Sequence, residues 1–470
     1  MPEPVLPPNL APALGNETTD SGLGASRDPA LRLPTDSDPA SAELAQHTTV
    51  GGPSPRFDWP RFIASAYGPT FLSTIGYGAV MPLVALSALS LGAGVGLSAL
   101  ITGLTGIGTI LGDLPASWVA TRLGEKKAIA LACLWDALCL AVAFSASTLP
   151  VLSLAVFCFG LSGSVFGLAR QSYITEAVPL KYRARALSSL GGTFRIGGFI
   201  GPLIGAAIIA TWNLSAAYAF AAIMSILAAG VTLLLPDLPA DVRARRAGPE
   251  GGPRLFTVLR AHVHTFATLG LGVFCVGFAR AVRQTVLPLW SESLGFDASQ
   301  TSLIYAVSMA LDMSMFFLGG FIMDRFGRMW VAVPSMVILG LGLASLALAH
   351  NGWGVVIVAG VIGLGNGIGS GIVMTLGSDA SPSVGRTQFL SGWRVFGDAG
   401  NALGPVALSI ITTLFSLAAA TVSLGAFSIV GAMWLGYWIR HSAAGHVHEL
   451  AAEQRSNDSA TTILVQESDD

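Results

Sequence analysis

Twelve apolar segments, each long enough to cross a lipid bilayer as a helix, dominate this sequence. A helix of about 20 residues crosses the hydrocarbon core of a bilayer. The 470 residues are 52% hydrophobic and only 11% charged, with a mean hydropathy of +0.66, whereas soluble domains are roughly 25% charged. The sequence therefore predicts an all-α integral membrane protein with twelve transmembrane helices. The segments are residues 62–86, 96–120, 128–149, 151–176, 186–211, 214–235, 264–291, 301–323, 330–350, 353–378, 388–412 and 416–438.

The segments form two groups of six, separated by one polar stretch that is rich in Pro, Arg and Gly. The first residues of the chain are rich in Pro, Ser, Ala and Asp and show no secretory signal, so they predict a disordered tail. The predicted parts are an N-terminal tail (1–56), a six-helix bundle (57–236), a central loop (237–262), a second six-helix bundle (263–441) and an acidic C-terminal tail (442–470).

The charges in the loops orient the predicted bundle. Alternate loops hold all the loop lysines and arginines, and the loops between them hold none. Basic loops stay on the cytoplasmic side of a membrane. The pattern predicts a multi-pass protein of the plasma (inner) membrane, with both tails and the central loop in the cytoplasm. The basic loop residues include Arg122, Lys126, Lys127, Lys181, Arg183, Arg185, Arg243, Arg245, Arg246, Arg325, Arg328 and Arg386.

The two groups of helices are copies of each other. Placing Gly124 on Gly327 defines an offset of 327 − 124 = 203 residues. Two parallel six-helix halves with this internal symmetry are typical of alternating-access transporters. The same offset, without a gap, places Gly160 on Gly363, Pro179 on Pro382, Gly201 on Gly404 and Pro202 on Pro405.

One charged motif follows the second helix of each group. In the second copy, four positions separate Gly320 from Asp324, so both lie on one face of the helix end. The acid can then meet a cation or a helix N-terminus of a neighbour, and Gly327 permits a tight turn. Alternatively, the motif only fixes the topology. The copies are SWVATRLGEKK (117–127), with Arg122 and Gly124, and GGFIMDRFGR (319–328), with Gly320, Asp324, Arg325, Gly327 and Arg328.

Two further motifs recur along the chain. An acid-x-x-Pro-x-x-x-Arg motif follows the fourth helix of each group, where its charges can form ion pairs that bias a conformational switch or plain surface pairs. A glycine-proline motif in the fifth helix provides small residues for close helix packing. The residues are Glu176, Pro179 and Arg183; Asp379, Pro382 and Arg386; and Gly197, Gly201, Pro202 and Gly205.

These motifs resemble the signatures of the major facilitator superfamily, and the likeness covers the chain apart from its tails. The resemblance implies two pseudo-symmetric six-helix bundles that work by alternating access. It also implies that the loop and acid–arginine motifs form a cytoplasmic gate, and that the glycine-proline motif is similar to that of twelve-helix drug/proton antiporters. Thr121 stands where the first loop motif usually carries its acid. We therefore expect the acid-dependent contact of the gate at Asp324.

Ionisable residues inside the predicted helices mark a candidate site, because such residues are costly in a membrane and usually face a cavity or a partner. Asp312 lies about 18 Å along the helix from Asp324, near mid-membrane. We expect Asp312 and Asp113 to be proton carriers, with arginines holding these acids or binding an anionic group. The alternative is a set of structural ion pairs. The predicted cavity residues are Asp113, Asp312, Arg195, Arg280, Arg283, Arg394 and Asp398.

The sequence favours a secondary active transporter of a small organic molecule, with a proton-coupled exporter (multidrug or metabolite efflux antiporter) as the leading hypothesis. The alternatives are an importer or facilitator of a metabolite such as an organic anion, and a membrane sensor that transports nothing. An enzyme is disfavoured, because the sequence has no metal-ligand cluster and no placed nucleophile. We expect no metal, cofactor or nucleic acid as partner. The expected partners are the substrate, H⁺ and the lipid bilayer, and the protein is expected to be a monomer.

Overall fold

The computed structural model describes residues 59–178, 180–234, 255–382 and 384–466 of the chain. Every regular element among these residues is helical, and twelve spans are long and apolar enough to cross a membrane. The prediction of an all-α fold with twelve transmembrane helices is confirmed. The predicted N-terminal tail and most of the predicted central loop lie outside the described residues.

Six spans make up the first half of the bundle. Its first span is divided at Met81 and Pro82, because a proline has no N–H to donate to the helix ladder. The elements are α2 (Trp59–Val80), α3 (Leu83–Ser90), α4 (Val95–Leu123), α5 (Glu125–Phe144), α6 (Leu149–Ala177), α7 (Leu180–Thr211) and α8 (Ala216–Leu233).

Six more spans make up the second half. The span through α11 and α12 contains one π-helical stretch, η1, and the tenth span is divided into α15 and α16. The elements are α10 (Leu255–Ala261), α11 (Val263–Thr265), η1 (Phe266–Gly270), α12 (Leu271–Ser293), α13 (Ala298–Phe326), α14 (Met329–Ser345), the 3₁₀ turn η2 (Leu346–Leu348), α15 (Gly352–Ile368), α16 (Ile372–Ala380), α17 (Arg386–Leu414) and α18 (Leu417–Gln466).

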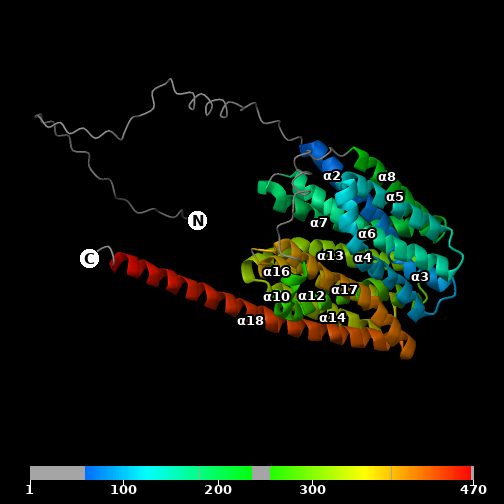
Figure 1. Ribbon diagram of the computed structural model, residues 1–470. Helices are drawn as coiled ribbons and strands as arrows, with labels where there is room; N and C mark the ends of the chain where they lie inside the picture. Colours follow the sequence, from blue (N-terminus) through cyan, green and yellow to red (C-terminus); the bar gives the residue numbers. More distant parts are fainter. Residues whose placement is uncertain (1–58, 179, 235–254, 383, 467–470) are drawn as a thin grey trace, which may run out of the picture. The chain divides into compact units, whose positions relative to one another are not determined.

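Two segments are helical beyond the predicted membrane spans. The last residues of the predicted central loop form α10, because Val258 and Leu259 pack into the apolar cluster that also holds Phe266 and Phe389. The last helix, α18, continues to Gln466, through most of the segment that was predicted as a C-terminal tail (Figure 1).

The repeat predicted from the sequence is visible in the backbone. Gly124 and Gly327 end α4 and α13 with φ of +79° and +94°. Glycine adopts this left-handed region without steric cost. The ends of α4 and α13 carry the basic loop motifs, and this side of the bundle is called the basic end here; the other side is called the opposite end.

The two halves meet along α4 with α17 and α7 with α13 (Figure 1). A Cβ added at Gly106 would lie 2.7 Å from the Cα of Ala402, so the α4 and α17 backbones are in close contact. The Ser299 hydroxyl donates a hydrogen bond of 2.9 Å to the Ala206 carbonyl, joining α13 to α7. These contacts lie toward the opposite end of the bundle.

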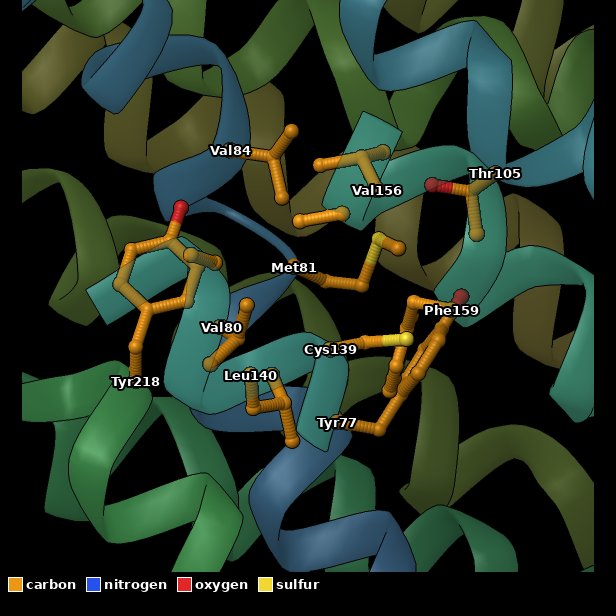
Figure 2. A pocket seen from close by; sticks show the side chains of 12 residues that line it. Tyr77, Val80, Met81, Val84, Thr105, Cys139, Leu140, Val156, Phe159 and Tyr218 are labelled. Carbon is orange, nitrogen blue, oxygen red and sulfur yellow. The ribbon is translucent and has the colours of Figure 1, made fainter. Parts of the chain in front are cut away.

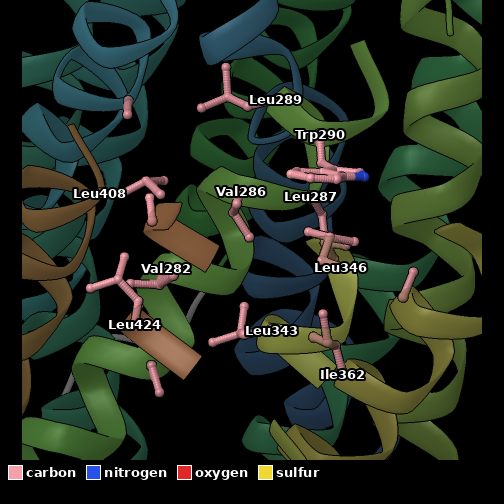
Figure 3. Close-up of a cluster of buried hydrophobic side chains, with 14 of the residues drawn as sticks. Val282, Val286, Leu287, Leu289, Trp290, Leu343, Leu346, Ile362, Leu408 and Leu424 are labelled. Carbon is pink, nitrogen blue, oxygen red and sulfur yellow. The ribbon is translucent and has the colours of Figure 1, made fainter. Parts of the chain in front are cut away.

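A large apolar core stabilises the second half near the opposite end. Side chains from α12, α14, α15, α17 and α18 interdigitate there, including Val286, Leu343, Ile362 and Leu424 (Figure 3). The Trp290 indole is buried in this cluster and donates a 3.0 Å hydrogen bond to the Ala349 carbonyl. Ala85 and Ala99 of the first half also belong to it. This end of the bundle is therefore packed across the two halves.

Candidate functional site

A polar cavity of about 240 Å³ lies between the two halves. It receives side chains from α2, α7, α12, α13, α15 and α17, so both halves contribute to its walls. Its size suits a small organic molecule. The lining residues are Thr74, Tyr77, Gly78, Met81, Phe194, Arg195, Gly198, Arg280, Arg283, Gln284, Tyr305, Met309, Asp312, Asn366 and Asn401.

Asp312 is the only carboxylate among these lining residues, and it is buried. Arg195, from the other half, forms an ion pair with one of its oxygens. Arg283 lies 3.4 Å from the other oxygen, and Asn366 donates a hydrogen bond to the same atom. A carboxylate in the membrane interior needs such partners, because an unpaired buried charge is costly. Asp312 therefore joins α13 to α7, α12 and α15.

Arg280 has a different environment from the other two arginines of the cavity. Its Nη2 donates a 2.8 Å hydrogen bond to the carbonyl of Gly369, in the interruption between α15 and α16. No ion pair of Arg280 occurs among the described side chains. Arg195 also reaches this interruption, where it donates to the hydroxyl of Ser370. Two guanidinium groups thus converge on the divided tenth span.

The cavity carries an excess of positive charge. Three arginines face one aspartate, a formal excess of 3 − 1 = 2 charges. Among the other lining residues, Tyr77, Phe194 and Tyr305 provide aromatic rings, Gln284 and Asn401 provide amides, and Met81 and Met309 provide apolar surface. Such a mixture can bind a flat apolar body that carries an anionic group and hydrogen-bonding substituents.

A second ion cluster lies outside this cavity. Arg394 of α17 lies 3.2 Å from the Asp113 carboxylate of α4 and 3.3 Å from Asp398, one turn further along its own helix. Counting along the helices, Asp113 is about 15 Å from the basic end of α4, whereas Asp312 is about 21 Å from that of α13. The Arg394 side chain is 37% exposed. The sequence placed all seven charged residues in one cavity, and the structure separates Asp113, Arg394 and Asp398 from the other four.

At the basic end, two predicted gate motifs meet within the second half. Arg328 donates a 2.8 Å hydrogen bond to Asp379, which raises the pKa of Arg328. Arg386 donates a 2.7 Å hydrogen bond to the Ser378 hydroxyl. Asp324 is exposed, and it has no ion-pair partner among the described side chains. The Arg328–Asp379 ion pair links the turn before α14 to α16, within the second half.

The remaining predicted gate residues have local surroundings. The guanidinium of Arg122 lies over the Trp118 ring, and that of Arg325 over the Phe326 ring. Glu176 is half-buried in the last turn of α6. The side chain of Arg183 lies outside the described part of the chain.

The glycine-proline motif of α7 lies against α2. A Cβ at Gly201 would contact the Ile75 carbonyl oxygen, and one at Gly205 would lie 3.1 Å from the carbonyl oxygen of Ala79. Gly197 contacts the Thr74 side chain in the same way. Pro202 is inside α7. These small residues allow α7 to approach the helix that forms one wall of the cavity.

Two further features of the first half are a small apolar pocket, which shares Tyr77 and Met81 with the cavity, and the buried side chain of Asp136. The pocket is lined by Tyr77, Cys139, Phe159 and Tyr218 among others (Figure 2), and its volume of about 10 Å³ leaves room for at most one water molecule. Asp136 is buried between α5 and α6, where it accepts a hydrogen bond from Ser162. Among the described residues, no group of three or more His, Cys, Asp or Glu side chains could hold a metal ion.

Several cavity residues were missed at the sequence level. Asn366 is a polar residue in the otherwise apolar α15, and that isolation was an available signal. Tyr77 and Tyr305 carry no such signal, since a tyrosine in an apolar helix is as often a core residue. Ser370 stands among glycines, and its role depends on the interruption of the helix.

Comparison with known proteins identifies the family. A model described as Major Facilitator Superfamily matches residues 69–270 and 269–465. A Na⁺, Li⁺, K⁺/H⁺ antiporter of Planococcus maritimus is 22% identical over 421 residues, which cover 82% of this chain and 97% of that protein. A gallate transporter of Pseudomonas putida is 32% identical over 144 residues, covering 28% of this chain and 31% of that protein.

Solved structures share the fold. The crystal structure of a D-xylose–proton symporter matches with a TM-score of 0.64 at 14% identity, covering 80% of this chain and 97% of that one. A peptide transporter POT mutant in complex with alafosfalin matches with a TM-score of 0.66 at 13% identity, covering 80% and 94%. With the two-bundle architecture and the family match over nearly all of the described residues, the chain belongs to the Major Facilitator Superfamily and is a multi-pass membrane transporter.

Proposed function

We propose that this protein couples the movement of a small organic anion to that of a proton, with Asp312 as the proton carrier. The observation that carries the proposal is the composition of the central cavity, in which three arginines face one aspartate. An anionic substrate would compensate the excess of positive charge, whereas a cationic one would increase it. The anionic substrate belongs to the alternative hypothesis from the sequence, an importer or facilitator of an organic anion, whereas the proton coupling belongs to the leading one.

The coupling follows from competition for the guanidinium groups. When Asp312 is ionised, it occupies Arg195 and Arg283. Protonation of Asp312 removes its charge and makes both arginines available to a substrate carboxylate. Binding of the proton and of the anion then favour each other, because linkage is reciprocal. Such mutual support is the thermodynamic basis of symport.

The arrangement of contacts supports alternating access. The halves are packed together toward the opposite end, and the Arg195–Asp312 pair joins them at the level of the cavity. Motion between the halves must change this pair. Protonation and substrate binding at Asp312 would therefore alter the equilibrium between the two access states.

The gallate transporter of Pseudomonas putida supports an anionic substrate, since gallate is a hydroxylated aromatic carboxylate and that protein shares 32% identity over 144 residues. The aromatic rings and amides of the cavity would suit a molecule of this kind. We propose that the basic end faces the cytoplasm of an inner membrane, because loop arginines are retained on that side.

A proton-coupled exporter is the second candidate. The antiporter of Planococcus maritimus, with 22% identity over 421 residues, and the glycine-proline motif of α7 favour this function. In that case the substrate and the proton would compete for Asp312 rather than bind together.

Flux into proteoliposomes distinguishes these functions. The full-length protein would be tested with gallate, benzoate and the cation tetraphenylphosphonium, with and without an imposed pH gradient. Anion uptake that follows an inward proton gradient is the expected result. Movement of the cation in the direction opposite to the movement of protons would support the exporter. Anion exchange whose rate does not depend on the pH gradient would indicate a facilitator.

A further inference from the structure

The tenth span is interrupted at the level of the cavity, although its copy in the first half is continuous. Between α15 and α16, Gly369–Gly371 leave the helix, and Gly371 has a φ of +82°. Subtracting 203 from these numbers gives residues 166–168, which lie inside the unbroken helix α6. The interruption is thus a property of the second half alone. Glycine makes it possible, because this backbone region is strained for other residues.

Two cavity arginines hold the interruption from different directions. Arg280 donates a 2.8 Å hydrogen bond to the Gly369 carbonyl, and Arg195 of the other half donates to the Ser370 hydroxyl. The Gly369 carbonyl also faces the amide N–H of Ile372 at 3.4 Å, a long and weak contact. Arg280 therefore provides the stronger of the two contacts with this carbonyl.

The other end of α16 is held by surface contacts. Asp379 pairs with Arg328 at 2.8 Å, with both side chains at least 40% exposed. Along its length, α16 buries Ile372 and Leu376, but Met374 is 75% exposed. Exposed ion pairs contribute little to stability. The short helix α16 is therefore attached through one buried face, through the 2.8 Å hydrogen bond that Trp393 of α17 donates to the Val373 carbonyl, and through the interruption at its start.

We propose that Arg280 binds the substrate by exchanging the Gly369 carbonyl for the carboxylate of the substrate, and that this exchange frees α16 to pivot at Gly369–Gly371. The inference rests on the proposed transport of an anion. A guanidinium binds a carboxylate through paired, charge-assisted hydrogen bonds, which are roughly twice as strong as bonds to a neutral acceptor. A substrate anion in the cavity can therefore displace the carbonyl. Substrate binding would then reach the basic end through α16 and its Asp379–Arg328 pair.

Hydrogen–deuterium exchange on the full-length protein in nanodiscs tests this exchange. We expect Arg280→Ala to raise the exchange rate of amides in Ile372–Ala380 about tenfold, which corresponds to the loss of one hydrogen bond to a charged group. Arg280→Lys should restore part of the protection. Benzoate or gallate should raise the rate in the unmodified protein and have no further effect in Arg280→Ala. Amides of α6 serve as the internal reference, because this copy has no interruption.

The outcomes separate the hinge from the function. Unchanged exchange in Arg280→Ala, or an equal increase in α6, overturns the role of Arg280. If proteoliposomes transport the anion but the anion does not alter the hydrogen–deuterium exchange rate of α16 amides, the substrate carboxylate does not replace the Gly369 carbonyl at Arg280. The proposed function would then still stand. If no anion is transported, the proposed function fails, and the response of Arg280→Ala still reports whether Arg280 holds α16.

Discussion

The two ion clusters that join the halves are built on opposite plans. In the cavity, one acid, Asp312, is shared by two arginines; nearer the basic end, one arginine, Arg394, is shared by two acids. The Asp312 side chain is 7% exposed, whereas Arg394 is 37% exposed. The cavity cluster has positive charge to spare for a ligand, and the other cluster has none. Both clusters connect the halves, but only the cavity cluster has arginines that can exchange their present partners for an anionic ligand.

The repeat makes this contrast informative. Arg195 and Asp398 occupy equivalent positions, since 195 + 203 = 398. Duplicated positions therefore carry opposite charges and serve different clusters. Divergence between the copies, rather than their symmetry, gives the cavity its excess of arginines.

The largest effect should follow Asp312→Asn. Amide nitrogen and oxygen cannot carry the proton, and Arg195 and Arg283 lose their shared carboxylate. We expect proton-driven anion uptake to fall at least tenfold, because the variant side chain cannot take up the proton, while gradient-independent exchange persists. Proteoliposome flux measures both. Asp136→Asn is the matched control, because it also removes a buried carboxyl but lies outside the cavity; retained coupling in Asp312→Asn would exclude this residue as the proton carrier.

The second-largest effect should come from replacing one arginine of each cluster, because the two variants should differ in the KM for anion uptake. We expect Arg280→Ala to raise the KM for anion uptake roughly 10–100-fold, because a charge-assisted hydrogen bond to the substrate is lost. Arg394→Ala should change the maximal rate more than KM, since Arg394 lies outside the cavity. Initial-rate kinetics with benzoate or gallate provide the comparison. Equal KM increases in both variants would mean that the clusters form one binding site.

We expect a smaller effect on the transport rate from replacing either of the two acids around Arg394, and a different effect for each. Asp113→Asn removes a contact between the halves, and Asp398→Asn removes one within α17. Because the site is partly exposed, the pair contributes about 0–1 kcal/mol. We expect Asp113→Asn to change the transport rate up to about fivefold and Asp398→Asn to change it less. The reverse order would argue against Asp113 as the link between the halves.

The smallest effect is expected in the loop motifs of the basic end. Asp324 is exposed and close enough to Arg328 to influence its pKa, whereas the Thr121 hydroxyl donates to the Ser117 carbonyl of its own helix. We expect Asp324→Asn to slow uptake about twofold, as suits an exposed charge, and Thr121→Ala to have no measurable effect. Equal, mild losses in both variants would remove the predicted asymmetry between the two loop motifs.

The sequence predicted the fold well because membrane spans are encoded by local composition. The apolar segments, the constant offset and the loop motifs were each readable without tertiary information. The rise per residue gave the depth of Asp312, but not the direction in which its side chain points. In helices that are apolar on all faces, that direction depends on packing, so the separation of Asp113 and Arg394 from Asp312 could not be predicted. The interruption of the tenth span was hidden too, since glycines recur throughout α15.

Proton binding at Asp312 and anion binding in the cavity are expected to favour each other. The direct test is to add benzoate or gallate to the purified protein in weakly buffered solution and to measure proton uptake or release. We expect net proton uptake on anion binding, and no uptake in Asp312→Asn. Proton release, or no proton movement despite measured anion binding in the unmodified protein, would contradict it.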